Sequence, residues 1–343
     1  MEQRVPLILD APNVGRNALS HFVRSCPTYQ TLNALVHEIP PIDLSKLDGP
    51  DHDQVANDFA NAAEVLGFFQ VLNHGMPLEL LESLKSSAND FFGQAPENKA
   101  AYRKGVSPSP YVKYGTSFVP ENEKALEWKD YLSMVYTTDA DALNYWPNEC
   151  KEVALEYLKT SIDMVEKIVK VLITKLGVIL EDSKLEALIG LRMVNMNYYP
   201  TCPDPELTVG IGHGIGGLYV KLEEELDAGK KGEWPEITPV PGALILSNGR
   251  YKSAEHRART KSSQSRVSVP IFTIPKATER IGPLPEVVES YGVARYREVV
   301  FEDYMNNFFS IAHDGKKSLD YATRSCKRYP VMLNKLSDCA IQN

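Results

Sequence analysis

Two hydrophobic patterns divide this chain. Within residues 53–66, 77–91 and 148–179 the apolar side chains recur every three or four residues, which is the spacing of one buried helix face. From residue 194 onward the apolar runs are short and are separated by turn-forming residues, which favours β-strands. We therefore expect an α+β protein with an α-rich first half and a β-rich second half.

The first hundred residues predict two helices and two strands. One helix is expected over residues 53–66, where Gly67 would end it, and a second begins at Pro77. Residues 68–72 form an apolar run typical of a buried strand, and residues 39–44, which contain two prolines, read as an edge strand. His74 follows the buried strand, and a structural contact with the backbone is favoured over catalysis.

Residues 103–147 are expected to be loop-rich, and they carry many aromatic side chains. These rings could line a pocket for a flat organic substrate. They could equally pack a layer of the core, and both readings stay open. The longest helix is predicted over residues 148–179.

The second half reads as an antiparallel barrel or sandwich, followed by a helix over residues 295–309. Its predicted strands are residues 194–199, 207–211, 217–222, 242–246 and 267–274. The expected organisation is an irregular lead-in (residues 1–38), an α-rich region (39–180), a β-rich domain (181–320) and a divergent tail (321–343).

Composition narrows the class of protein. The net charge of −8 and the sequence pI near 5.5 argue against nucleic acid or an anionic membrane as the main partner. No apolar run approaches the roughly 20 residues that span a bilayer, and the start of the chain does not resemble a secretory signal. The five cysteines are scattered and show no CxxC spacing, which favours free thiols in a reducing compartment. We expect a cytoplasmic protein.

One stretch combines three chemically useful side chains. His256 lies between two strand-like runs, and Arg266 and Ser268 follow on the next run with one residue between them. Because side chains alternate along a strand, Arg266 and Ser268 would share a face. A guanidinium and a hydroxyl on one face can bind a carboxylate, and a metal could lie at His256. A loop histidine beside a solvated strand face is the alternative, and spacing alone does not decide between the two.

Longer motifs resemble the plant non-haem iron(II), 2-oxoglutarate-dependent dioxygenases over residues 39–320. The residues that carry this resemblance are Gly67–Gly75, Asn197–Leu207, Leu246–Arg257 and Arg266–Ser268. Three further segments are similar to the feruloyl-CoA and coumaroyl-CoA ortho-hydroxylase branch of that family: Tyr114–Phe118, Ala125–Met134 and His313–Lys317.

The resemblance implies a double-stranded β-helix, or jelly roll, with helices packed outside. It implies Fe(II) held by His256 and His213, and 2-oxoglutarate held by Arg266 and Ser268. Tyr199 would assist the carboxylate contact, and Asn197 would steady the site. The implied reaction uses O2 and 2-oxoglutarate, with ascorbate as a candidate reductant, to hydroxylate a small phenylpropanoid-type aromatic, such as a hydroxycinnamoyl-CoA, in a monomeric enzyme.

The sequence departs from the family pattern at the metal site. The pattern is His-x-Asp, whereas His213 is followed two residues later by Ile215. The run at residues 243–246 is also shorter than the resemblance implies, which predicts a shortened jelly roll. Two functions therefore stay open. The chain is a working hydroxylase, or it is a catalytically impaired pseudoenzyme or shortened gene product of the same family.

Overall fold

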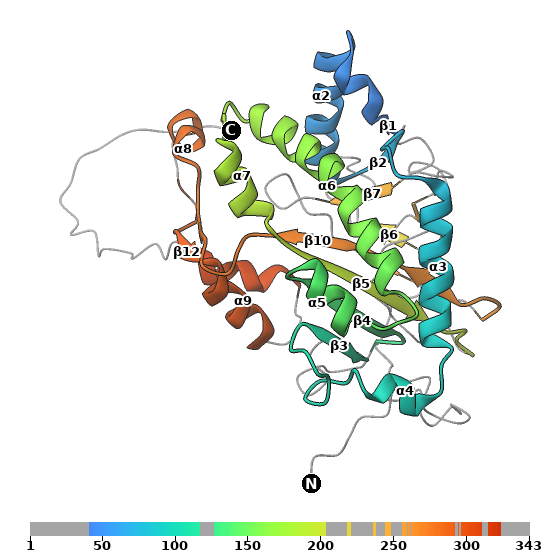
Figure 1. Ribbon diagram of the computed structural model, residues 1–343. Coiled ribbons are helices and arrows are strands. Elements are labelled where there is room, and N and C mark those ends of the chain that lie inside the picture. Colours follow the sequence, from blue (N-terminus) through green and yellow to red (C-terminus); the bar gives the residue numbers. More distant parts are fainter. Residues whose placement is uncertain are drawn as a thin grey trace.

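The computed structural model describes residues 41–116, 127–203, 218–220, 236–237, 244–247, 256–258, 260, 262–291, 294, 296–310 and 315–323. Within these ranges, helices from the first half of the chain lie against a sheet that both halves build (Figure 1). None of the described helices is both long and apolar enough to cross a lipid bilayer.

The N-terminal region begins with a small sheet and two helices. Strand β1 (Ile42–Asp43) is parallel to β2 (Phe68–Leu72), and β2 is antiparallel to β7 (Leu244–Ser247). Helix α2 (His52–Asn61) continues as one π-helical turn (Ala62–Leu66). Gly67 then ends the helix with a left-handed φ of 75°, a conformation that costs glycine little. The edge strand, the helix and its glycine stop are confirmed.

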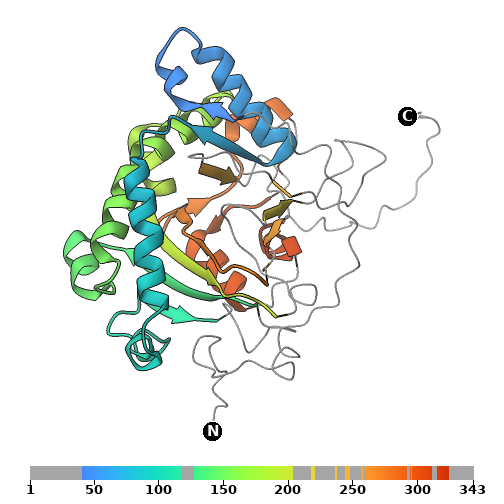
Figure 2. The ribbon, with the colours of Figure 1, turned by 90° about the vertical axis from the view of Figure 1, so that its right-hand side faces the viewer.

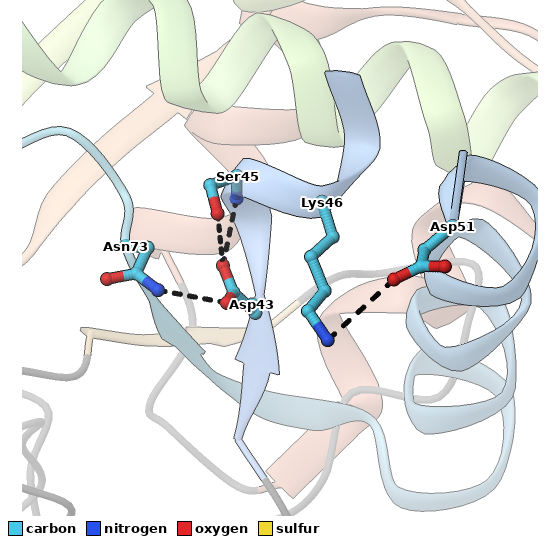
Figure 3. Close-up of polar contacts among 5 residues, drawn as sticks. All are labelled: Asp43, Ser45, Lys46, Asp51 and Asn73. Atoms are coloured by element: carbon cyan, nitrogen blue, oxygen red, sulfur yellow. Dashed lines mark hydrogen bonds and ion pairs between the residues drawn. The ribbon is translucent and has the colours of Figure 1, made fainter. Parts of the chain in front are cut away.

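Asp43 links β1 to the turn after β2 (Figure 3). Its carboxylate accepts a hydrogen bond from the Ser45 hydroxyl at 2.7 Å, from the Ser45 backbone N–H at 3.1 Å and from the Asn73 amide at 2.9 Å. Asn73 has a positive φ of 50°, and its bond to Asp43 holds it in that turn. These hydrogen bonds lower the pKa of the Asp43 carboxyl, with the Ser45 hydroxyl as the largest cause.

His74, in the same turn, has a structural contact. It is buried, and its Nδ1 accepts a hydrogen bond from the Met76 backbone N–H at 3.2 Å. The prediction of a backbone contact for this histidine is confirmed.

The main sheet has the order β10-β5-β4-β3, and β9 pairs with β5 beyond the end of β10. Its strands are β3 (Val112–Gly115), β4 (Asp130–Tyr136), β5 (Leu191–Tyr199), β9 (Arg266–Ser268) and β10 (Ile271–Ile274). All of these pairings are antiparallel.

The expectation of a loop-rich segment at residues 103–147 is wrong where β3, β4 and helix α5 (Asp139–Tyr145) lie. In β4, Leu132 and Met134 turn toward the helices, and the polar or amphipathic Tyr131 and Ser133 alternate with them. The alternation of apolar and polar residues that marks a strand is hard to recognise here, because the alternating positions hold a tyrosine and a serine and the segment is rich in aromatic residues.

Helices α3 (Leu78–Phe92) and α6 (Lys151–Thr174) cover one face of the main sheet. Figure 2 shows both helices on the same side of β5. Val194 and Met196 of β5 are fully buried in the core that these helices form. The predicted long helix is therefore present, and it starts and ends a few residues inside the expected range.

The aromatic side chains of residues 103–147 mainly pack the core. Tyr114, Trp128 and Trp146 are almost fully buried, whereas Tyr111 and Tyr145 are exposed. Tyr114 contacts Phe91 edge to face, with ring centroids 5.7 Å apart. The core-packing reading is thus correct for Tyr114 and Trp146, which belong to the core under α3 and α6. Tyr131 lies on the same face as Asn197, and Phe118 lies outside the described residues.

The remaining described elements are short. They are the strand pair β6 (Leu218–Val220) and β8 (His256–Ala258), the pair β11 (Arg280–Ile281) and β12 (Val299–Val300), helices α4 (Pro96–Ala100), α7 (Asp182–Ile189), α8 (Pro285–Tyr291) and α9 (Phe301–Ser310), and two 3₁₀-helices (Leu44–Asp48 and Gly315–Ala322). Helix α9 begins later than predicted because β12 precedes it. The predicted strand at residues 207–211, the lead-in and nearly all of the tail lie outside the described residues.

Candidate cosubstrate and metal site

The pairing of β5 with β9 brings four predicted site residues together. In its register Asn197 lies opposite Ser268, and Tyr199 lies opposite Arg266. Residues directly opposite in an antiparallel pair project from the same face of the sheet. Tyr198, between the two, projects from the other face and stacks on Phe92 of α3 with ring centroids 5.3 Å apart. The four side chains therefore occupy the sheet face that is turned away from α3 and α6.

This face is polar and yet buried. Asn197 is 3% exposed and Ser268 is 4% exposed. The Asn197 side-chain oxygen and the Ser268 hydroxyl make no hydrogen bond within the part of the chain that the structure describes. Buried polar groups are normally hydrogen-bonded, so these two atoms are suited to a polar ligand.

Arg266 and Tyr199 contact each other at one end of this face. The Arg266 guanidinium carbon lies 4.9 Å from the centre of the Tyr199 ring, within the range of a cation–π contact. Burial raises the pKa of the Tyr199 phenol, and the positive charges of Lys129 and Arg266 partly oppose that rise. The phenol is therefore protonated at neutral pH and can donate a hydrogen bond.

These groups match a carboxylate. Arginine presents a planar fork of N–H donors that fits a carboxylate, and a serine and a tyrosine hydroxyl can each add a donor. The strand register thus brings Arg266, Ser268, Tyr199 and Asn197 together on one face. Their individual roles remain predictions.

His256 lies on a different strand pair. It is half-buried on β8, opposite Val220 of β6. No group of three or more His, Cys, Asp or Glu side chains that could hold a metal occurs among the described residues. His213 and Ile215 lie outside them. The metal half of the predicted site is therefore represented by one imidazole, and both metal-ligand assignments remain predictions.

Sequence reasoning missed a buried ion pair beside this face. Lys129 Nζ lies 2.9 Å from Glu127 Oε2, and the two side chains are 2% and 14% exposed. A charged pair two residues apart usually reads as a solvated turn. The available signal was the alternation of Lys129, Tyr131 and Ser133, which marks one strand face.

Asn195 and Ser133 extend the polar face. They lie opposite each other in the pairing of β4 with β5, on the same face as Asn197. Asn195 is 2% exposed, and its side-chain oxygen makes no hydrogen bond within the described residues. The buried polar face therefore continues along β4 and β5 beyond those four residues.

Comparison with known families identifies the class to which this fold and donor set belong. Residues 39–151 match the N-terminal domain model described as non-haem dioxygenase in morphine synthesis, and residues 191–275 match the 2OG-Fe(II) oxygenase superfamily. Non-haem dioxygenases that use 2-oxoglutarate are thus the class that both halves define. The chain belongs to the 2OG-Fe(II) oxygenase superfamily, and the family resemblance read from the sequence is confirmed.

Two plant enzymes show the similarity in detail. Scopoletin 8-hydroxylase of Arabidopsis thaliana is 60% identical over 304 residues, covering 82% of this chain and 83% of that protein. A bi-functional coumaroyl CoA and feruloyl CoA ortho-hydroxylase of Ipomoea batatas is 44% identical over 308 residues, with 83% of each chain covered.

Solved structures confirm the fold class. JOX2, in a complex with 2OG, Fe and JA, superposes with a TM-score of 0.73 at 27% identity, covering 92% of this chain and 99% of that one. A rice dioxygenase for auxin oxidation superposes with a TM-score of 0.62 at 22% identity, covering 80% and 95%. The predicted α+β jelly-roll class is therefore confirmed. Whether the jelly roll is shortened remains a prediction.

Proposed function

We propose that this chain binds 2-oxoglutarate on the β5–β9 face and hydroxylates a small phenylpropanoid-type aromatic. The observation that carries the proposal is the buried donor set of Asn197, Tyr199, Arg266 and Ser268. The names of the relatives indicate two substrates to test, a coumarin such as scopoletin and a hydroxycinnamoyl-CoA. Scopoletin comes first, because the relative that carries its name shares more of the sequence.

Each residue of the donor set has a proposed task. Arg266 and Ser268 hold the carboxylate of 2-oxoglutarate that is remote from the reacting end. Tyr199 donates its hydroxyl to the same carboxylate, and Asn197 orients these groups through its side-chain amide. Their burial excludes water, which strengthens the charge-assisted hydrogen bonds.

The donor set for Fe(II) is less complete. His256 and His213 are the proposed ligands, but Ile215 carries no ligand atom at the position where the family pattern has aspartate. Two neutral imidazoles offset less of the metal charge than two imidazoles and a carboxylate. The residues present therefore fit the cosubstrate better than they fit the metal, and we derive no reaction step through the metal.

A second candidate function follows from Ile215. The chain would then be a non-catalytic relative that binds 2-oxoglutarate or an aromatic ligand without turnover. A monomeric state, a cytoplasmic location and the use of ascorbate also remain predictions from the sequence.

An anaerobic titration with Fe(II) and 2-oxoglutarate tests the hydroxylase. We expect a weak visible charge-transfer band, and under air with scopoletin we expect succinate and a product heavier by one oxygen atom. Feruloyl-CoA is assayed in parallel. Absence of both the band and succinate would eliminate the hydroxylase.

The variant Ile215→Asp separates the two candidates. If the chain is impaired, the variant gains the band and succinate formation that the wild-type chain lacks. If the wild-type chain is already active, the band is present before the substitution. The matched control is Ile215→Asn, because asparagine is similar in size to aspartate but adds no negative charge.

A further inference from the structure

Lys129 is an unusual residue for its position. Lysine is rarely fully buried, because its charge is costly to remove from water. Here the side chain is 2% exposed and is paired with Glu127 at 2.9 Å. The pair lies directly before β4, at the end of the strand that borders the proposed carboxylate site.

The strand register places Lys129 next to Tyr199. In the pairing of β4 with β5, Asp130 lies opposite Tyr198. One residue further toward the same end of the pair, Lys129 precedes β4 and Tyr199 ends β5. The Trp128 indole N–H donates to the Pro200 carbonyl oxygen at 3.2 Å and ties the same two strand ends together. Tyr199 therefore has Arg266 on the strand to one side and Lys129 on the other.

The electrostatics agree with this placement. The positive charges of Lys129 and Arg266 both lower the pKa of the Tyr199 phenol, against the larger effect of burial, and the negative charge of Glu127 raises it. The charges of Lys129 and Glu127 thus both act on the Tyr199 phenol.

The donors beside Tyr199 determine where its hydroxyl proton can point. Lysine and arginine can donate hydrogen bonds but cannot accept them. When Lys129 and Arg266 both donate to the Tyr199 hydroxyl, that hydroxyl directs its own proton to a third group that accepts, and a carboxylate is such a group.

We propose that Lys129, held by Glu127, is a positioning residue that acts through Tyr199 and directs the Tyr199 hydroxyl toward the remote carboxylate of 2-oxoglutarate. This inference rests on the proposed function, which places 2-oxoglutarate at Arg266, Ser268 and Tyr199. It adds a second cation to that site. Lys129 directly precedes β4, whereas the four residues of the proposed site come from β5 and β9.

Calorimetric titration of the full chain with 2-oxoglutarate tests the inference, under anaerobic conditions with Mn(II) in place of Fe(II). The substitution Lys129→Met should weaken binding by about tenfold, because an aligned charge-assisted hydrogen bond is lost. Lys129→Arg, which keeps the donor and the charge, should recover most of that loss. If Lys129→Met folds poorly, Lys129→Gln, which removes the charge but keeps an N–H donor, is measured and should bind more weakly than Lys129→Arg.

A double-mutant cycle tests whether Lys129 acts through Tyr199. In a Tyr199→Phe background, Lys129→Met should weaken binding no further, because the hydroxyl that it positions is gone. Fully additive losses would overturn the inference.

Lys99→Met is the matched control for burying a methionine in place of a lysine. Lys99 is 1% exposed, and it donates to the Phe92 carbonyl oxygen at 3.0 Å on the helix-covered side of the sheet. This variant should lower thermal stability and leave the affinity for 2-oxoglutarate unchanged. An equal loss of affinity in Lys99→Met would overturn the inference.

The two proposals fail in different ways. A wild-type chain that binds no 2-oxoglutarate overturns the proposed function and this inference with it. Wild-type binding with unchanged affinity in Lys129→Met overturns this inference alone.

Discussion

Arg266 shows how far a single residue could be understood from the sequence. Strand alternation placed it on one face with Ser268, and the structure agrees, because both lie opposite β5 residues of that face. The contact between the Arg266 guanidinium and the Tyr199 ring was beyond sequence reasoning. That contact depends on which strand pairs with β9, and the sequence contains no local signal for the partner strand.

Lysine in place of Arg266 should separate charge from shape. A lysine keeps the positive charge but loses the planar fork that matches a carboxylate, so we expect the affinity for 2-oxoglutarate to fall by about tenfold or more. Calorimetric titration measures the change. Arg192→Lys, on the opposite face of β5, is the matched control and should bind as the wild type does. Equal affinity for Arg266→Lys and wild type would contradict a forked contact.

Lys129 marks the limit of residue-scale prediction. A charged residue in a polar segment normally reads as solvated. Its burial arises from the surrounding strands, which come from segments far apart in the chain. Only the register of β4 against β5 shows that it lies beside Tyr199.

At the scale of elements, the helices were the easiest to predict. Regular apolar spacing identified α2, α3 and α6, and Gly67 gave the end of the first helical segment. Strand β4 was missed, although it is central to the main sheet. One of its faces is polar and lines the candidate site, so it lacks the apolar character that marks a buried strand.

Acid should weaken the link between β1 and the turn after β2. The lowered pKa of Asp43 means that its ionised form is favoured in the folded protein. This stabilisation is present above the unfolded-state pKa, close to the ordinary value of 3.8, and is lost as the pH falls through the lower folded-state pKa. We therefore expect Asp43→Asn to be less stable than wild type at pH 6, with a difference that narrows below about pH 4.

Denaturant unfolding of both proteins at a series of pH values measures that difference. Asp90→Asn, at an exposed position on α3, is the matched control and should differ little from wild type at any pH in the series. A gap between Asp43→Asn and wild type that stays constant down to pH 3 would show that the Asp43 hydrogen bonds do not favour its charge.

At the scale of the whole molecule, the segments that match the two family models, residues 39–151 and 191–275, do not form separate structural units. The main sheet combines β3 and β4 from the first half with β5, β9 and β10 from the second, and α3 and α6 cover it. The predicted boundary near residue 180 therefore falls between elements that share one core. The division into four regions is still a prediction from the sequence.

Residues 181–343, expressed without the first half, should not fold. Strand β5 would lose its partner β4, and its buried Val194 and Met196 would face water without α3 and α6. We expect the fragment to aggregate, or to remain soluble without a cooperative unfolding transition. Circular dichroism recorded during heating measures this. A cooperative transition in this fragment would contradict the shared core, and the full chain measured in parallel is the control.

The pairing of β2 with β7 has a consequence for synthesis on the ribosome. Phe68 pairs with Ser247, so the partner of this strand is translated roughly 180 residues later, which at ordinary rates takes about 10–35 seconds. During that interval the apolar segment Phe68–Leu72 has emerged without its neighbour. A nascent chain in this state can pair with other extended chains. Chaperone supply and growth temperature should therefore govern the yield of native protein more strongly than the stability of the finished fold.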